Sequence, residues 1–336
     1  MKKVLFATTA LIATAGMAAA EVKVSGYGRF GLDWNEANDA VAGTSDTNLT
    51  SRFRLTFDAS TETDGGVTVG GRIRAQAESR DGTPGTAAWS APQFHVAYGG
   101  LRVNVGNIWG AIDSAPGLYL NTTSVGTGID GMGFNSLAIG NSFAWDTFTS
   151  AGAGRNGIEA IYSAGGFTGH VSYSQSNGGT VLGSAQGLER SAIMLSYSFG
   201  DYFVTGAYQS EDNNTNTVTF SNGAVESQGD ELGFFAIGGN FGQYGATLSY
   251  GTTQEADTVT LAGSAEIGAA STIVGWVNST DVDANVTAGQ TRTDGTAFGI
   301  NYEYDLGGGV TFVAGYVNTA AATNENSLQA GLHFSF

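Results

Sequence analysis

The residues with the clearest chemical potential are basic ones near the beginning of the chain. Eight of the eleven basic residues that follow position 20 lie between Lys23 and Arg102. Six of these alternate with other residue types in three short stretches, at Lys23, Arg29, Arg52, Arg54, Arg72 and Arg74. Arginine keeps its charge at any working pH, so a group of such side chains would create a permanent positive field.

Alternation of residue types indicates how these side chains are positioned. A period of two is typical of a strand with one apolar and one polar face. In residues 22–34, 49–58 and 67–78 the apolar residues share one parity, and the basic residues share the other. Neighbouring antiparallel strands lie about 5 Å apart. We therefore expect the six basic residues to form one surface, the basic wall.

The same alternation continues to the last residues, 328–336, and predicts about sixteen strands. Short turns such as Gly99-Gly100 and Gly200-Asp201 trade places with longer polar loops. An even strand number, unequal loops and aromatic residues at strand ends are typical of a transmembrane barrel that is apolar outside and polar inside. The predicted fold class is all-β, a transmembrane antiparallel β-barrel. A soluble all-β sandwich would also alternate, but it would not need these features together.

Composition and the first residues agree with a membrane barrel. Charged residues make up 13% of the chain, and no later stretch approaches eighteen consecutive apolar residues, so a membrane role must use strands. Lys2 and Lys3, an apolar stretch and three alanines predict a signal peptide over residues 1–20, followed by a barrel domain over 21–336. The formal net charge is −17, and it becomes −19 when Lys2 and Lys3 are removed, which disfavours nucleic acid as a partner.

One segment interrupts the alternation. Residues 106–156 contain scattered Gly, Asn, Ser and aromatic residues, together with Asp113, Asp130 and Asp146. A connection of this length is uncommon and usually functional. If this third long loop folds into the lumen, it narrows the pore and sets Asp113 and Asp130 against the basic wall, creating a transverse field that orients dipolar solutes. Alternatively, the arginines are solvated lumen residues balanced by acids on their own strands, namely Asp33, Asp58 and Glu78.

Catalytic chemistry finds little support. The chain has no Cys, which excludes disulfides, thiolate metal sites and cysteine nucleophiles, and its three His residues show no ligand spacing. We find no motif of a serine hydrolase, zinc protease or P-loop protein. The nearest candidate pair, His170 with Ser172 or Ser174, is of a kind expected in any polar lumen. The chain is therefore predicted not to be an enzyme.

Three stretches carry a resemblance to a known family. They are residues 21–31 (EVKVSGYGRFG), residues 105–113 (VGNIWGAID) and residues 331–336 (GLHFSF). With them, the mature chain resembles the general diffusion porins of the Gram-negative outer membrane, in particular the Rhodobacter-type porins of alphaproteobacteria. The resemblance implies sixteen strands, a homotrimer, an inward third loop, contact with lipopolysaccharide, and a terminal Phe336 that is read by the barrel-assembly machinery. Some members bind calcium near the constriction, which implies Asp113 and Asp130 as possible ligands here; no other cofactor is expected.

These observations predict an outer-membrane channel for passive diffusion of small hydrophilic solutes and ions. A substrate-selective channel for sugars or anions is the alternative, with Trp109, Tyr119 and Trp145 as a stacking path. A role without transport, as an adhesin or anchor, is a third hypothesis. Ion preference stays open, because the net charge favours cations at the mouths while the basic wall attracts anions inside.

Overall fold

The computed structural model describes residues 20–80, 83–132, 144–176, 187–212, 217–227, 231–288, 294–319 and 326–336. The predicted signal peptide lies outside these residues except for its last position, and it stays a prediction. In the described part of the chain, no helix is long and apolar enough to cross a membrane.

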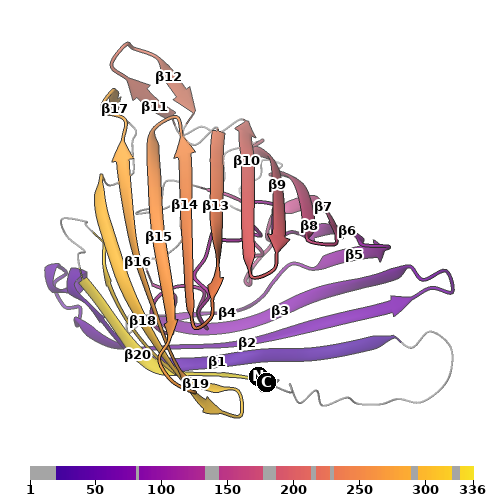
Figure 1. The fold of residues 1–336 in the computed structure, drawn as a ribbon, viewed down its shortest axis with the longest axis horizontal. Coiled ribbons are helices and arrows are strands. Elements are labelled where there is room, and N and C mark those ends of the chain that lie inside the picture. The colour runs from indigo at the N-terminus through magenta and orange to yellow at the C-terminus, as the bar shows by residue number, and fades with distance from the viewer. Residues whose placement is uncertain are drawn as a thin grey trace.

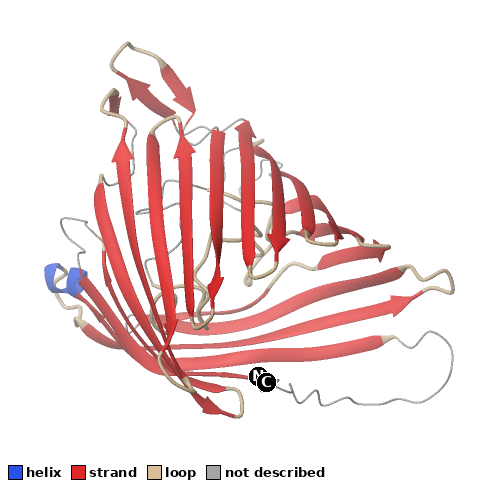
Figure 2. Cartoon of the chain, in the orientation of Figure 1, coloured by secondary structure: helices blue, strands red, loops and turns tan. Residues whose placement is uncertain are grey.

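Seventeen strands of the described residues form one antiparallel sheet that curves back on itself (Figure 1, Figure 2). Neighbours in the sheet follow chain order, and the last strand pairs with the first, which closes the barrel. The strands of this sheet are β1 (Glu21–Asn35), β2 (Thr47–Glu62), β3 (Thr68–Arg80), β4 (Thr83–Trp89), β5 (Gln93–Tyr98), β6 (Leu101–Asn107), β7 (Asn156–Ala164), β8 (Phe167–Gln175), β9 (Glu189–Phe199), β10 (Tyr202–Asp212), β13 (Glu231–Phe241), β14 (Tyr244–Thr253), β15 (Ala256–Glu266), β16 (Ser271–Val282), β18 (Gly295–Gly307), β19 (Val310–Asn318) and β20 (Asn326–Ser335).

Two of these strands share one place in the wall. β4 pairs with the second half of β3, and β5 pairs with its first half. The described sheet therefore has sixteen places around its circumference, and the predicted sixteen-stranded antiparallel barrel is confirmed. The sequence did not predict β4, because its residues do not alternate in type.

The tight turns follow from local sequence. Tyr98 and Leu101 are directly paired, so Gly99 and Gly100 alone connect β5 to β6. Both glycines have positive φ angles, 55° and 85°, which a two-residue turn of this hand requires and which glycine adopts without steric cost. The turn at residues 200–201 has the same length, since Phe199 pairs with Tyr202.

Some residues lie beyond the barrel wall. A short 3-10 helix, η1 (Glu36–Ala40), follows β1. A small sheet joins β11 (Thr217–Phe220), β12 (Val225–Ser227) and β17 (Val286–Ala288), and it projects from the end of the barrel that carries the longer loops (Figure 1). These strands lie in two of the longer polar loops that the sequence predicts, residues 211–229 and 278–295.

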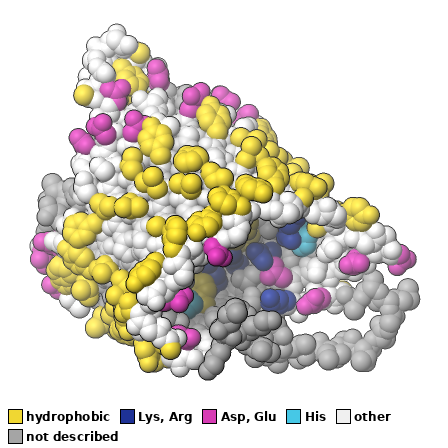
Figure 3. Space-filling view, viewed as in Figure 1, with side chains coloured by type: hydrophobic (Ala, Val, Ile, Leu, Met, Phe, Trp, Pro, Cys, Tyr) yellow, Lys and Arg dark blue, Asp and Glu magenta, His cyan; other side chains and the backbone are white. Residues whose placement is uncertain are grey.

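The outer face of the barrel is apolar. Exposed large hydrophobic residues recur at every second position along much of the strands, as with Val259 and Leu261 of β15, which are 48% and 52% exposed. Apolar side chains cover this face in Figure 3, while Lys, Arg and His side chains gather in the hollow of the barrel. Aromatic rings lie beside the short turns, where Phe199 stacks on Tyr202 and Phe241 meets Tyr202 edge to face. This arrangement suits a wall that meets lipid outside and water inside.

Candidate functional site

The strand register places the predicted arginines of β1, β2 and β3 side by side on the inner face. Arg29 is directly opposite Arg52, and Arg54 is opposite Gln76. Arg72 is opposite Asp58, whose other neighbour in register is Lys23. The side chain of Lys23 is exposed at the beginning of β1. The alternation therefore correctly predicted that these residues share one face of the sheet. They differ in the side chains that they contact.

Two arginines are balanced by acids on neighbouring strands. Arg52 Nε donates to Glu78 Oε2 at 2.6 Å, and Arg72 Nε donates to Asp58 Oδ1 at 2.6 Å. The Arg72 and Asp58 side chains are 30% and 32% exposed, so water screens their pairing. These two pairs agree with the alternative interpretation, in which acids of the wall itself compensate the basic residues.

Arg54 has a different environment. Its Nε donates to the neutral Gln76 Oε1 at 2.7 Å, and its guanidinium lies 5.0 Å from the centre of the Tyr27 ring. No carboxylate of the described residues forms an ion pair with it within 4.0 Å. Arg54 therefore contributes a positive charge to the inner face that no carboxylate of the described residues contacts directly.

The aperiodic segment lies inside the barrel. We call residues 108–155, between β6 and β7, the inward segment; residues 108–132 and 144–155 of it are described. Thr123 N donates to Glu303 Oε1 of β18 at 2.7 Å, and Gly128 N donates to Asn301 Oδ1 at 2.8 Å. These bonds connect the segment to the wall opposite its point of entry, so it crosses the lumen.

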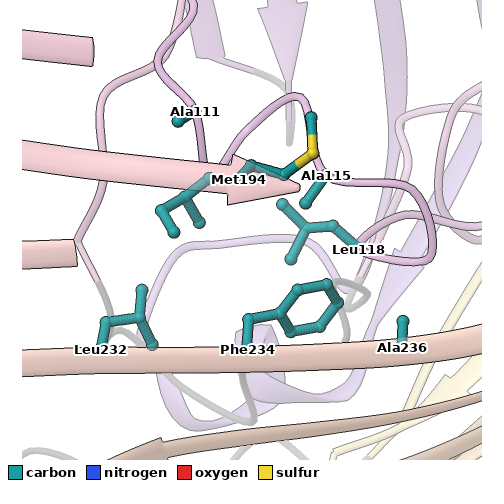
Figure 4. Close-up of a cluster of buried hydrophobic side chains, with 8 residues drawn as sticks. Ala111, Ala115, Leu118, Met194, Leu232, Phe234 and Ala236 are labelled. Atoms are coloured by element: carbon teal, nitrogen blue, oxygen red, sulfur yellow. The ribbon is translucent and has the colours of Figure 1, made fainter. Parts of the chain in front are cut away.

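An apolar cluster attaches the first part of the inward segment to the wall. Its members from the segment are Ala111, Ile112, Ala115 and Leu118, and its members from β9 and β13 are Met194, Leu232, Phe234 and Ala236 (Figure 4). All are almost completely excluded from solvent. Burial of a leucine side chain contributes about 1.5–3 kcal/mol, so this cluster keeps the segment against the wall.

Asp130 meets the wall as an ion pair. Its Oδ1 lies 2.7 Å from Arg29 Nη2, and the two side chains are only 5% and 4% exposed. The Thr50 hydroxyl donates to the same carboxylate, and Asp130 N donates to Gln329 Oε1 at 2.9 Å. Arg29 is therefore enclosed between wall and segment, whereas the sequence predicted it on the open surface of the pore.

The hydrogen-bond partners of Asp113 are not arginines. Its Oδ1 accepts from the Tyr119 hydroxyl at 2.6 Å and from Trp145 Nε1 at 3.2 Å, both within the inward segment. Burial raises the pKa of Asp113, and these two hydrogen bonds oppose the rise. Asp113 and Asp130 have no bonding partner in common. No group of three His, Asp or Glu side chains suited to a metal occurs among the residues that the structure describes, and calcium at these two acids stays a prediction.

Arg74 differs from the other basic residues because aromatic rings enclose it. Its guanidinium lies 4.8 Å from the ring centre of Trp109 and 4.4 Å from that of Phe148. Only 9% of the residue is exposed. The prediction that Arg74 lines the open pore is therefore corrected, since the two ends of the inward segment cover its charge.

Sequence reasoning missed Glu159, a fully buried acid on the inner face of β7. It accepts hydrogen bonds from Asn104 Nδ2 at 2.7 Å and from Gly110 N at 2.9 Å, and it lies 3.1 Å from His170 Nε2. Ser172 Oγ accepts from Ala111 N at 3.0 Å. His170 thus serves Glu159, and Ser172 serves the backbone, so the two do not form a nucleophile–base pair. The sequence did contain one signal for Glu159, because it is an acid on the polar face of the strand that follows the aperiodic segment.

Four charged residues hold the other end of the inward segment. Arg190 of β9 binds Glu211 of β10 and lies 3.4 Å from Asp146 Oδ1, and Arg155 lies 3.7 Å from the same oxygen. The sequence showed Asp146 only as one of the acids of the aperiodic segment. In the structure it pairs with Arg190 on β9 and with Arg155, which directly precedes β7, so the last part of the inward segment is attached to the wall between β7 and β10.

Comparisons with known proteins agree on one family. The family profile described as "Gram-negative porin" matches residues 7–326. A porin of Fuscovulum blasticum is 30% identical over 327 residues, covering 94% of this chain and all of the relative, and a porin of Rhodobacter capsulatus is 25% identical with the same coverage. A solved structure of a Rhodopseudomonas blastica porin variant superimposes with a TM-score of 0.70 at 27% identity, over 94% of this chain and all of that chain.

One conclusion follows from these similarities together with the structure. The barrel is closed, its outer face is apolar, its inner face is polar, and one segment crosses its lumen. The chain belongs to the Gram-negative porin family, and it forms an outer-membrane channel, not an enzyme, for the passive diffusion of small hydrophilic solutes.

Proposed function

We propose that the narrowest part of this channel lies between the inward segment and the inner face of β2 and β3, and that its field favours anions. The observation that carries this proposal is the environment of Arg54, whose neighbours Gln76 and Tyr27 carry no formal negative charge. Arg52 and Arg72 are balanced by Glu78 and Asp58, so Arg54 supplies the excess charge of this face. A charge in a confined aqueous pore acts more strongly than the same charge on an open surface.

The reversal potential in a salt gradient tests this proposal. Arg54→Ala should move the selectivity of single channels toward cations, because it removes a charge without exposing an unpaired acid. Arg72→Ala is the matched comparison, because it removes the same single charge from the same face and leaves Asp58 unpaired, so it should also move selectivity toward cations. Unchanged reversal potentials in both variants would reject the basic surface as the selectivity element.

The partners of the channel are also proposals. We propose a homotrimer in contact with lipopolysaccharide, supported by the family resemblance, and native mass spectrometry with and without added lipopolysaccharide tests both.

We propose that the barrel-assembly machinery recognises Phe336, whose ring stacks on Phe53 and Phe334 on the outer face. Phe336→Ala should lower the yield of assembled barrel in cells, and an unchanged yield would contradict this role.

A further inference from the structure

We propose that Arg74 is a positioning residue that clamps the two ends of the inward segment and so keeps the open channel steady. This role separates Arg74 from Arg54, although the alternation of the sequence makes the two residues look equivalent. The proposal rests on the location of the constriction given above, but it concerns the steadiness of the pore and not its ion preference.

The clamp joins residues that are far apart along the chain. Trp109 follows the end of β6, and Phe148 precedes the beginning of β7, so the two rings come from opposite ends of the inward segment. Their centres are 5.3 Å apart. The guanidinium of Arg74, which belongs to β3, lies within 5 Å of both ring centres. One side chain of the wall therefore contacts both ends of the segment.

The chemistry of this contact requires arginine. A planar guanidinium can stack on aromatic faces, whereas a lysine ammonium is a compact and strongly hydrated charge. In the described residues no carboxylate forms an ion pair with Arg74, and its Nε has no hydrogen-bond partner. The rings are thus its main source of charge stabilisation, and a cation that is desolvated against aromatic faces gains more than an exposed one.

Further hydrogen bonds surround the clamp. Arg74 Nη1 donates to Ser150 Oγ at 3.3 Å, and Arg74 N donates to Ser90 Oγ at 2.9 Å. Asn107, the last residue of β6, binds the far end of the segment directly, because its Nδ2 donates to Thr149 O at 2.8 Å and its Oδ1 accepts from Thr149 N at 3.1 Å. The bonds of Asn107 lie on the side of β6 and β7. Arg74 adds the attachment to β3, across the entry of the segment.

Loss of the clamp should therefore change the motion of the segment more than it changes the electric field in the pore. Without Arg74, Trp109 and Phe148 lose their common partner, and the entry of the segment can shift relative to β3. The segment spans the lumen, so such shifts would appear as fluctuations of the open-channel current and as closure at lower voltage. The reversal potential should change little, because the rings and the protein cover the charge that is removed.

Single-channel recording in planar bilayers tests this separation of roles. Arg74→Ala should raise the open-channel noise several-fold and lower the closing voltage, with a reversal potential close to that of the wild type. Arg74→Lys should keep the charge but restore the steady current only in part. Arg54→Ala should show the opposite pattern, a shifted reversal potential with normal noise. Normal noise in Arg74→Ala, or a reversal shift equal to that of Arg54→Ala, would overturn the proposal.

A second pair of variants covers the case in which Arg74→Ala does not assemble. Phe148→Leu and Trp109→Leu each remove one ring and leave every charge in place. Both should raise the noise, and a steady current in both would also overturn the clamp. If Arg54→Ala leaves selectivity unchanged while Arg74→Ala raises the noise, the proposed constriction charge fails and the clamp stands.

Discussion

Replacement of Asp130 by alanine should detach the middle of the inward segment from the wall. The Arg29–Asp130 pair is almost fully enclosed, with side chains 4% and 5% exposed, so neither water nor salt screens it. Removal of one partner from a buried ion pair costs about 3–5 kcal/mol, because the other charge is left without compensation. The hydrogen bond from the Thr50 hydroxyl is lost as well.

This loss of free energy should weaken the attachment of the segment near Asp130 and leave the stability of the barrel unchanged. The strand ladders that bring β1 beside β2 and β20 do not involve the side chain of Asp130. Asp130→Ala should therefore accelerate amide hydrogen exchange of residues 127–132, measured by mass spectrometry in detergent. A cost of about 3 kcal/mol corresponds to an acceleration of about two orders of magnitude, since 1.4 kcal/mol is a factor of ten.

A double-mutant cycle separates the ion pair from general damage. Arg29→Ala alone should accelerate exchange of the same amides, because it leaves the Asp130 carboxylate buried. The double variant should be less affected than either single variant, since no uncompensated charge remains. Purely additive effects, or exchange rates equal to those of the wild type in Asp130→Ala, would refute the assignment of this pair as an anchor.

Two further variants test other attachments of the inward segment. Glu159→Gln should lower the thermal unfolding midpoint and accelerate hydrogen exchange of the Gly110 amide. An amide nitrogen cannot accept a hydrogen bond from the donors that surround the carboxylate, and each lost bond to a charged group costs about 1.5–3 kcal/mol. An unchanged midpoint would contradict this role. Asp113→Asn should raise the unfolding free energy at neutral pH and leave it unchanged in acid, measured by chemical denaturation at several pH values. Burial raises the pKa of Asp113, so the folded protein binds this proton more tightly, and the wild type loses that stabilisation as pH rises through the raised pKa. An effect that does not depend on pH would contradict it.

The barrel was predictable because its signals are local and repeated. Alternation fixes which side chains of β1, β2 and β3 point inward, and pairs such as Gly99-Gly100 fix the turns. Each weak signal agrees with the next, which is why the strand number came out correctly. β4 escaped prediction because Thr83–Trp89 does not alternate in type, although it continues the wall beside β3.

The arrangement inside the barrel could not be predicted in the same way. The inward segment has no period, so its path depends on contacts between residues far apart in sequence, such as Asp130 with Arg29. The sequence therefore indicated a basic inner face but not which arginine stays uncovered. Arg54 and Arg74 have the same parity on adjacent strands, but Trp109 and Phe148 of the aperiodic segment enclose Arg74 and not Arg54.

Single-channel conductance in the presence of neutral polymers of graded size tests the central claim most directly. A passive, water-filled pore narrowed by the inward segment should give a linear conductance that rises in proportion to salt concentration. Small polymers should reduce it in proportion to bulk conductivity, and polymers above one size limit should have no such effect. Folded protein that gives no current, or a conductance that saturates with salt, would contradict the account.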